Sequence, residues 1–132
     1  MSDQIGFTAS IAETRTIAKD ETVVCPNVIT NDGNGYDSKT GIFIAPKSGM
    51  YVFSVIATSQ KGSMFKFRIF RKGVPCATAF ANTPNACAMG GNTVVLTLEL
   101  NDQVCVKAAD VSAIWGDQTD YSFTFTGFMV GQ

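Results

Sequence analysis

The feature that most constrains the fold of this 132-residue chain is an alternation of apolar and polar side chains with a period of two. In its clearest example, Phe65, Phe67 and Ile69 alternate with Lys66 and Arg68. Successive side chains of a β-strand point to opposite faces, so this pattern predicts a strand with one apolar and one charged face. No segment of useful length shows the 3.6-residue period of an amphipathic helix. The chain is therefore predicted to be all-β.

The same alternation predicts further strands, each with one apolar face. These faces are Ile5, Phe7, Ala9 and Ile11; Tyr51, Phe53, Val55 and Ala57; Val94, Leu96, Leu98 and Leu100; Val104, Val106 and Ala108; and Tyr121, Phe123 and Phe125, which lead into residues 127–130. Turn residues rich in glycine and asparagine separate the strands at 31–35, 39–41, 47–49 and 71–73, and the last turn is predicted to close a hairpin. Many short strands with regularly spaced turns are typical of a sandwich or a barrel.

Composition narrows both the domain organisation and the chemistry of the chain. With 45% hydrophobic and 16% charged residues, it is expected to bury one core and to form a single domain over residues 1–132. The absence of histidine excludes histidine-based catalysis and imidazole metal ligands, and no Lys/Asp/Glu constellation indicates an active site, so no enzyme activity is expected. The net charge of −1 gives no reason to expect nucleic acid as a partner, and no apolar run approaches the roughly 20 residues of a membrane span.

Residues 31–55 carry the most informative motif. They read NDGNGYDSKTGIFIAPKSGMYVFSV and place in order Asn31, Tyr36, Phe43, Gly49, Tyr51 and Phe53. This spacing resembles the signature of the C1q domain family. Two positions depart from that signature: Cys25 stands where it opens with Phe, and Val55 stands where it ends with an aromatic residue. Both replacements remain apolar, so they bear on the local packing of side chains more than on the resemblance to the family.

Three further segments agree with the family pattern in the same order along the chain. They are RKGVPCATAF at residues 71–80, LELNDQVCVKA at residues 98–108 and SFTFTGFMV at residues 122–130. The resemblance therefore extends from about Ile5 to Val130. It implies a ten-stranded jelly-roll sandwich of the C1q/TNF type that assembles as a homotrimer. The apolar strand faces exceed what one small sandwich needs, and a closed trimer would bury the surplus.

The resemblance also implies a role outside the cell, although residues 1–4 lack the basic start and apolar run of a secretory signal. The expected function is that of an innate-immune, lectin-like recognition module that binds glycans or anionic molecules of microbial surfaces. The alternative is a signalling ligand of the C1q/TNF type that binds a cell-surface protein receptor. The chain carries no collagen-like Gly-X-Y tract and so resembles the stand-alone versions of the domain.

A basic cluster is the first candidate ligand site. It consists of Lys66, Arg68, Arg71 and Lys72. Lys66 and Arg68 point to the same side of one strand, about 7 Å apart, and could grip a sulfate, a phosphate or the carboxylate of a sialic acid. The alternative is a solvated face whose charges keep the strand from pairing with a neighbouring molecule.

The segment 110–121 contains the second candidate site, formed by Trp115, Asp117 and Gln118. An aromatic face stacks on the C–H groups of a sugar, while the carboxylate and the amide accept hydrogen bonds from its hydroxyls. The alternative is that Trp115 packs over the end of the barrel or lies at a subunit contact.

No cofactor is expected. Many C1q-type domains hold calcium in the loop that here reads FANTPNACAMGGN, residues 80–92, and this loop contains no Asp or Glu. Because calcium prefers carboxylate ligands, the family's calcium site is predicted to be missing. Asp117 and Asp120 are a weaker candidate for a different site.

The four cysteines, Cys25, Cys76, Cys87 and Cys105, allow three full disulfide pairings and form no C-x-x-C motif. They are either buried thiols that pack as small hydrophobic side chains or include one disulfide. Cys76 and Cys87 are close in sequence and form the candidate pair.

Overall fold

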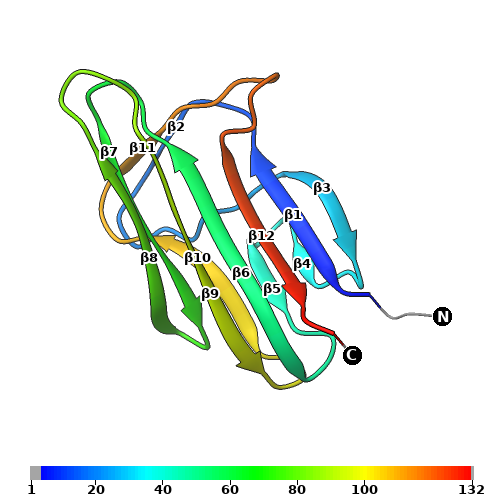
Figure 1. Cartoon of the computed structure of the whole chain (residues 1–132). Helices are drawn as coiled ribbons and strands as arrows, with labels where there is room; N and C mark the ends of the chain where they lie inside the picture. Colours follow the sequence, from blue (N-terminus) through cyan, green and yellow to red (C-terminus); the bar gives the residue numbers. More distant parts are fainter. Residues whose placement is uncertain (1–3, 132) are drawn as a thin grey trace.

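Two five-stranded antiparallel sheets pack face to face in the computed structural model, which describes residues 4–131 (Figure 1). The β6 sheet has the strand order β3-β1-β12-β6-β9, the β10 sheet has the order β4-β5-β10-β7-β8, and β2 pairs with β11 in a small third sheet. The strands are β1 (Gly6–Ile11), β2 (Arg15–Ile17), β3 (Asn27–Asp32), β4 (Tyr36–Asp37), β5 (Ile42–Ile44), β6 (Gly49–Thr58), β7 (Met64–Arg71), β8 (Val74–Asn82), β9 (Met89–Leu98), β10 (Gln103–Ala108), β11 (Ser112–Ile114) and β12 (Phe123–Met129). The first three residues, on which the expectation about a secretory signal partly rests, lie outside the described part.

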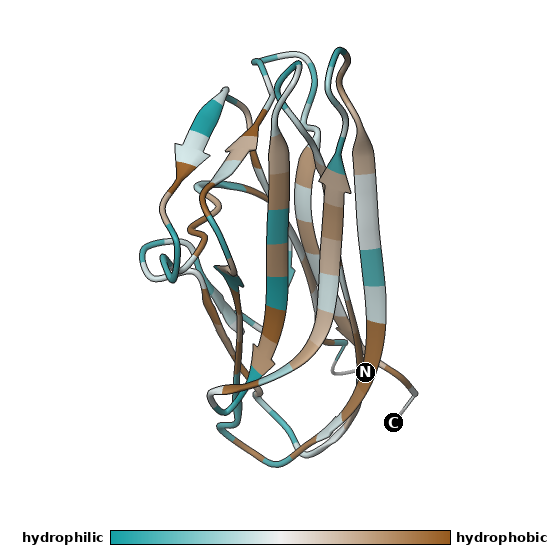
Figure 2. Ribbon diagram, turned by 90° about the vertical axis from the view of Figure 1, so that its left-hand side faces the viewer, coloured by the Kyte–Doolittle hydropathy of each residue, from teal (hydrophilic) through white to brown (hydrophobic). Residues whose placement is uncertain are grey.

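The predicted all-β, ten-stranded jelly-roll sandwich is confirmed, and the short pair β2–β11 adds to it. Figure 2 shows the alternation behind it as bands of polar and apolar residues along the strands. The two ends of the sequence lie side by side, because β1 pairs with β12 from Gly6 opposite Phe128 to Ile11 opposite Phe123. Within residues 4–131, no helix is long and apolar enough to cross a membrane.

The predicted apolar strand faces line the space between the sheets, with two exceptions. Leu100 is 57% exposed, because β9 ends at Leu98 and the chain turns there. The Asp102 N–H donates to the Glu99 carbonyl in this turn, and Asn101 has a φ of 73°. Tyr121 is 48% exposed, because β12 begins only at Phe123. Both residues were predicted to lie in strands, and both predictions were wrong, since each residue belongs to a loop.

An aromatic cluster joins the two sheets at the centre of the core. The Phe7 ring of β1 stacks on Tyr36 and Phe43 of the β10 sheet, with centroid distances of 4.9 and 5.1 Å, and meets the edge of Phe125 at 5.0 Å. Gly127 makes room for this cluster, because a Cβ atom at that position would lie 2.6 Å from the rings of Phe7 and Phe53. The glycine of the last family segment therefore has a packing role.

Both departures from the family signature are buried in the core. Val55 is 1% exposed and Cys25 is fully buried. The Cys25 N–H donates to the Tyr36 hydroxyl at 3.0 Å. Burial raises the pKa of the Cys25 thiol to about 12, and the hydrogen bond with Tyr36 opposes this rise only in part. Cys25 is therefore a neutral thiol that fills the core.

All four cysteines are free thiols. The candidate pairing of Cys76 with Cys87 is wrong for a geometric reason. Cys76 lies near the start of β8, whereas Cys87 lies past its end in a loop held to the 59–62 turn by the bonds from Ser59 N–H to the Ala88 carbonyl and from Gly62 N–H to the Ala86 carbonyl. The strand between them is about 20 Å long, whereas the Cα atoms of a disulfide lie within about 7 Å.

Candidate functional site

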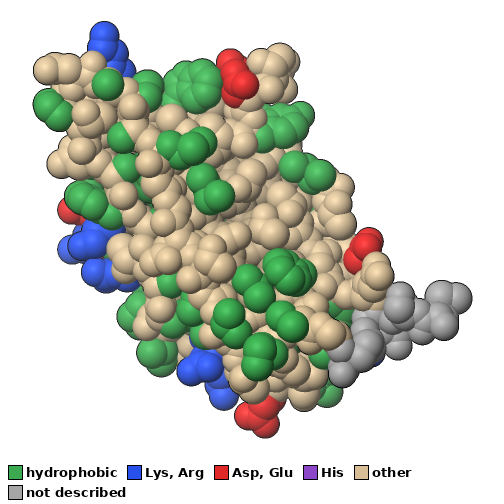
Figure 3. Space-filling model, viewed as in Figure 1, with side chains coloured by type: hydrophobic (Ala, Val, Ile, Leu, Met, Phe, Trp, Pro, Cys, Tyr) green, Lys and Arg blue, Asp and Glu red, His purple; other side chains and the backbone are tan. Residues whose placement is uncertain are grey.

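The outer face of the β6 sheet carries no charged side chain on the three neighbouring strands β12, β6 and β9, where apolar side chains alternate with Thr, Ser and Gly. The outward positions on these strands are Thr124, Thr126 and Phe128; Met50, Val52, Ser54, Ile56 and Thr58; and Met89, Gly91, Thr93, Val95 and Thr97. Figure 3 views this side of the molecule, and Lys, Arg, Asp and Glu side chains lie only around its rim. We call these thirteen positions the uncharged face.

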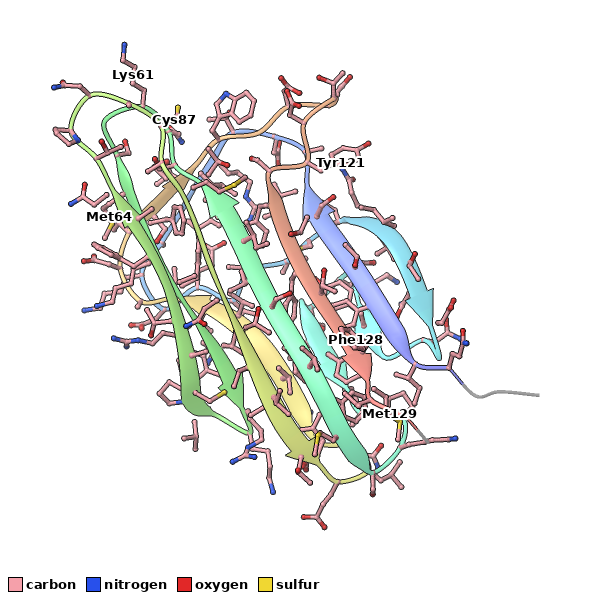
Figure 4. The ribbon with its side chains drawn as sticks, in the orientation of Figure 1. Lys61, Met64, Cys87, Tyr121, Phe128 and Met129 are labelled. Carbon is pink, nitrogen blue, oxygen red and sulfur yellow. The ribbon has the colours of Figure 1, made fainter. Side chains whose placement is uncertain are left out.

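Register brings the largest apolar side chains of the uncharged face together. Val52 lies between Phe128 of β12 and Val95 of β9, and Figure 4 places Phe128 on the last strand. Met50, Ile56, Val95 and Phe128 are each 41–56% exposed. Surface that is this apolar and lacks charge marks an interaction site more often than a solvated one. The uncharged face is therefore a candidate assembly surface.

A shallow hollow of about 560 Å³ lies at one end of the uncharged face, lined by Ile56 and by residues 89–93. Gly91 shapes it, because a Cβ atom there would lie 2.7 Å from the Val55 carbonyl oxygen and 2.8 Å from the Ile56 side chain. Glycine thus keeps β9 close against β6 at this point.

The outer face of the β10 sheet has the opposite character. Lys66 and Arg68 of β7 project from it together, as their spacing predicted. Lys107 of β10 lies directly opposite Arg68 and adds a third cation. We call Lys66, Arg68 and Lys107 the basic patch. Sequence reasoning missed Lys107, since the alternation places it on an outer face but does not reveal that β10 pairs with β7.

Arg71 and Lys72 lie apart from the basic patch. Arg71 is opposite Val104, an inward-facing residue, so it projects from the other face of the strand at the end of the sandwich. Lys72 lies at the tip of the predicted hairpin, with φ values of 51° at Lys72 and 79° at Gly73. Its Nζ atom lies 3.8 Å from an oxygen of Asp102. The structure therefore brings together two of the four basic residues proposed as one cluster.

The loop between β11 and β12 holds the second candidate site. Trp115 is half-buried, and its N–H donates to the Thr58 carbonyl at 2.9 Å, while its own carbonyl accepts the Ser122 hydroxyl. One oxygen of Asp117 accepts the Thr119 N–H, the Thr119 hydroxyl and the Asp120 N–H at 2.8–2.9 Å. These bonds, that from the Thr119 N–H first, lower the pKa of Asp117. Much of the hydrogen-bonding capacity of this carboxylate thus serves its own turn.

Gln118 is exposed and lines a hollow of about 330 Å³ with Ala12, Glu13, Pro26 and Asn27. The Thr14 hydroxyl joins this loop to the segment before β2, because it donates to the Gly116 carbonyl at 3.0 Å and lies 3.2 Å from the Gly116 N–H, which donates to it. The three residues predicted as a sugar site therefore share one loop that is hydrogen-bonded to the segment before β2. Gln118 lines the same hollow as Glu13 and Asn27. The role of these residues remains a prediction.

The loop at residues 80–92 offers a cation only amide, hydroxyl and backbone oxygens, because its side chains include no carboxylate, the ligand that calcium prefers. Within residues 4–131, no group of three or more Asp, Glu, Cys or His residues is placed to hold a metal, Asp117 and Asp120 included. The predicted loss of the family's calcium site remains a prediction.

Comparison with known proteins gives a family match over almost the whole chain. The sequence profile of the C1q domain matches residues 6–130. The mouse (Mus musculus) protein named complement C1q tumor necrosis factor-related protein 3 is 30% identical over 129 residues, which cover 96% of this chain and 51% of that protein. The chain therefore spans about half the length of this curated relative.

Solved structures share the fold at much lower identity. The globular domain of zebrafish complement 1qA matches with a TM-score of 0.80 at 17% identity, over 98% of both chains. Murine APRIL, in its crystal structure at pH 5.0, matches with a TM-score of 0.74 at 10% identity, over 96% of this chain and 99% of that one. The Eiger TNF of S. frugiperda gives a TM-score of 0.75 at 8% identity, over 99% and 95% of the two chains. These likenesses show the jelly-roll fold alone.

Proposed function

The chain belongs to the C1q domain family, and from this premise we propose that it is a non-catalytic recognition module that acts outside the cell as a homotrimer. Its proposed ligands are glycans or anionic molecules of microbial surfaces, bound in the manner of an innate-immune, lectin-like receptor. The observation that carries the proposal is the contrast between an uncharged face on one sheet and a basic patch on the other.

The uncharged face supports assembly. Removing apolar surface from water contributes roughly 25 cal/mol per Å², and Met50, Val95 and Phe128 are all about half exposed in the single chain. Burying these side chains requires no desolvation of charge, because the uncharged face carries none. Three copies related by a closed three-fold axis would cover this surface in every subunit.

Assembly through the uncharged face would leave the outer face of the β10 sheet directed away from the axis. The basic patch would then occur three times on the outside of one particle. Contacts that are weak in one subunit gain avidity when a repetitive surface engages several subunits at once. This arrangement supports recognition of a polymer or a crowded surface.

The alternative function is that of an extracellular signalling ligand for a cell-surface protein receptor. The observation in its favour is the similarity to complement C1q tumor necrosis factor-related protein 3. A receptor would contact a broader surface than a sugar does, about 800 Å² on each partner, and free sugar would not displace it.

Two measurements test the proposed function. Light scattering is expected to give about three times the chain mass of 14.1 kDa. The intact trimer is then applied to an array of sialylated, sulfated, mannosylated and bacterial glycans. A selective signal that free sugar displaces supports the lectin-like function. A monomer at micromolar concentration contradicts the assembly, and an array without signal from an intact trimer favours the receptor ligand.

A further inference from the structure

We propose that Lys66, Arg68 and Lys107 form a binding site for polysaccharides that carry sulfate or phosphate ester groups. The inference rests on the proposed function, since it names the ligand class and the residues of the same recognition module. Lys107 becomes part of this site only through the pairing of β10 with β7.

Strand register fixes the spacing of the three cations. Arg68 and Lys107 are paired directly, which places their Cβ atoms about 5 Å apart, and Lys66 lies two residues along β7, about 7 Å from Arg68. β7 is an inner strand, held by β10 on one side and β8 on the other. The Lys66 N–H also donates to the Ser112 hydroxyl at 3.0 Å. The cations therefore project from a backbone that is ordered before any ligand arrives.

No carboxylate neutralises the basic patch. None of its three side chains forms an ion pair within residues 4–131. Backbone hydrogen bonds bring Asp20 and Glu21 beside Ala108, and the bond from the Ala109 N–H to the Lys66 carbonyl brings Asp110 near the patch. The Glu21 carboxylate accepts the Ala18 N–H and lies 4.0 Å from Arg15. One oxygen of Asp110 accepts the Val111 N–H, and Asp20 forms no ion pair with the patch.

Like charges directly opposite each other destabilise a sheet. Arg68 and Lys107 keep this unfavourable arrangement, and an anion placed between them would relieve it. Sulfate and phosphate esters suit the position, because a guanidinium group binds their oxygens in pairs and an ammonium group adds a point charge.

Aromatic side chains beside the cations favour a sugar as the carrier of the anion. The Nζ atom of Lys107 lies 5.2 Å from the centroid of the Phe70 ring, a cation–π contact that orients the lysine. Phe80 is directly opposite Lys66 and is 54% exposed. An exposed ring next to a cation offers a stacking surface for the C–H groups of a pyranose while the cation holds its ester group.

The small size of the basic patch favours a polysaccharide over a nucleic acid. Stable binding of a nucleic acid commonly uses 6–10 phosphate contacts or a row of stacked bases. One subunit offers three cations and one largely exposed ring, which suit one or two anionic sugar units. Threefold repetition would extend the contact to a long chain.

Titration calorimetry with a heparin-derived, sulfated hexasaccharide tests the site on the full chain. The variants Arg68→Ala and Lys107→Ala are each expected to weaken binding about five- to tenfold. Lys61→Ala is the matched control, because Lys61 is an exposed lysine at the distant 59–62 turn (Figure 4), and it is expected to stay within twofold of the wild type. Lys107→Arg keeps the charge and is expected to retain most of the affinity.

Parallel titrations separate the possible sources of the anion. A phosphorylated mannose oligosaccharide tests phosphate esters, and a DNA oligonucleotide of equal charge tests general attraction to polyanions. Binding of either sugar that depends on both Arg68 and Lys107 supports the proposal. Equal affinity for the DNA, no binding to the wild type, or equal loss in all three alanine variants overturns it.

Light scattering on the same samples separates this proposal from the proposed function. If a monomer binds the sulfated hexasaccharide through Lys107, the proposed binding site is supported and the proposed trimer is contradicted. If an intact trimer binds neutral sugars, and Lys107→Ala leaves that binding unchanged, the recognition function stands and the basic patch fails as its site.

Discussion

The two outer faces of this molecule are built from strands with the same alternating pattern, and they differ only in what fills the outward positions. On β6 these positions hold Met50, Val52, Ser54 and Ile56, whereas on β7 they hold Lys66 and Arg68. Apart from the strand ends, the inward positions of both strands are equally buried. Folding therefore needs the inward half of the pattern, and the outward half is free to serve assembly on one sheet and ligand binding on the other.

The largest difference between the two faces is expected when one charge is added to each. Val95→Asp places a carboxylate in the uncharged face, where assembly would bury it without a partner, and we expect the trimer to dissociate at micromolar concentration. The matched variant Thr78→Asp adds the same charge to β8, opposite Arg68, and is expected to leave the trimer intact. Light scattering distinguishes the two, and a trimeric Val95→Asp protein would contradict the assigned assembly surface.

Removing one exposed aromatic ring from each face gives a smaller effect of the same kind. Phe128 and Phe80 are 46% and 54% exposed, so neither ring is central to the fold of the single chain. We expect Phe128→Ala to weaken each subunit contact by about 1 kcal/mol, roughly half the value for fully burying a large apolar side chain, because only the exposed half of the ring is left to bury. Phe80→Ala is expected to leave the trimer–monomer equilibrium unchanged. Analytical ultracentrifugation measures the trimer–monomer equilibrium of both variants. Equal effects of the two substitutions would contradict the assignment of the uncharged face as the assembly surface.

Changing the core tests whether the basic patch depends on tight packing between the sheets. Gly127→Ala introduces a Cβ atom 2.6 Å from the rings of Phe7 and Phe53, and overpacking of this kind costs about 1–3 kcal/mol in the free energy of unfolding. Chemical denaturation measures the loss. We expect sulfated-sugar binding by the folded protein to persist, whereas an unchanged stability would show that the aromatic cluster adjusts easily.

The buried Cys25 thiol is expected to make the stability of the fold depend on pH. The pKa of Cys25 is about 12 in the folded chain and 9.0 when exposed, so unfolding releases a proton above pH 9. The stability that this thiol contributes is complete below pH 9 and is lost as the pH rises toward 12, by on the order of 1 kcal/mol at pH 10. Cys25→Ala is expected to lower this alkaline loss relative to the wild type in denaturation at pH 8 and pH 10, and an identical loss would contradict the assignment.

Alternation alone predicted the inner half of the molecule. Phe65, Phe67 and Ile69 are fully buried because period-two spacing and burial are the same property in a sandwich. The pattern failed at Leu100 and Tyr121, where an apolar residue follows or precedes a strand without belonging to it. Burial there depends on where the hydrogen-bonded ladder ends, which the spacing does not encode.

The sequence predicted only those residues of the basic patch that lie on the same strand. Lys66 and Arg68 share a strand, so their common direction follows from their spacing. Lys107 joins them through a pairing between residues 39 positions apart in the sequence, and Arg71 leaves them because it occupies an inward position of the same strand. Contacts across strands require the sheet order, and the sequence of one chain does not supply it.

The pairing of β1 with β12 determines how the domain can be attached to a support. The Met129 N–H donates to the Ile5 carbonyl, so the first and last described strands reach the same end of the sandwich, while the 59–62 and 115–122 loops lie at the other end (Figure 1). A tag or fused protein at either terminus would leave from the same side. Tethering the domain by its start or by its finish would therefore present the same loops to whatever approaches from solution.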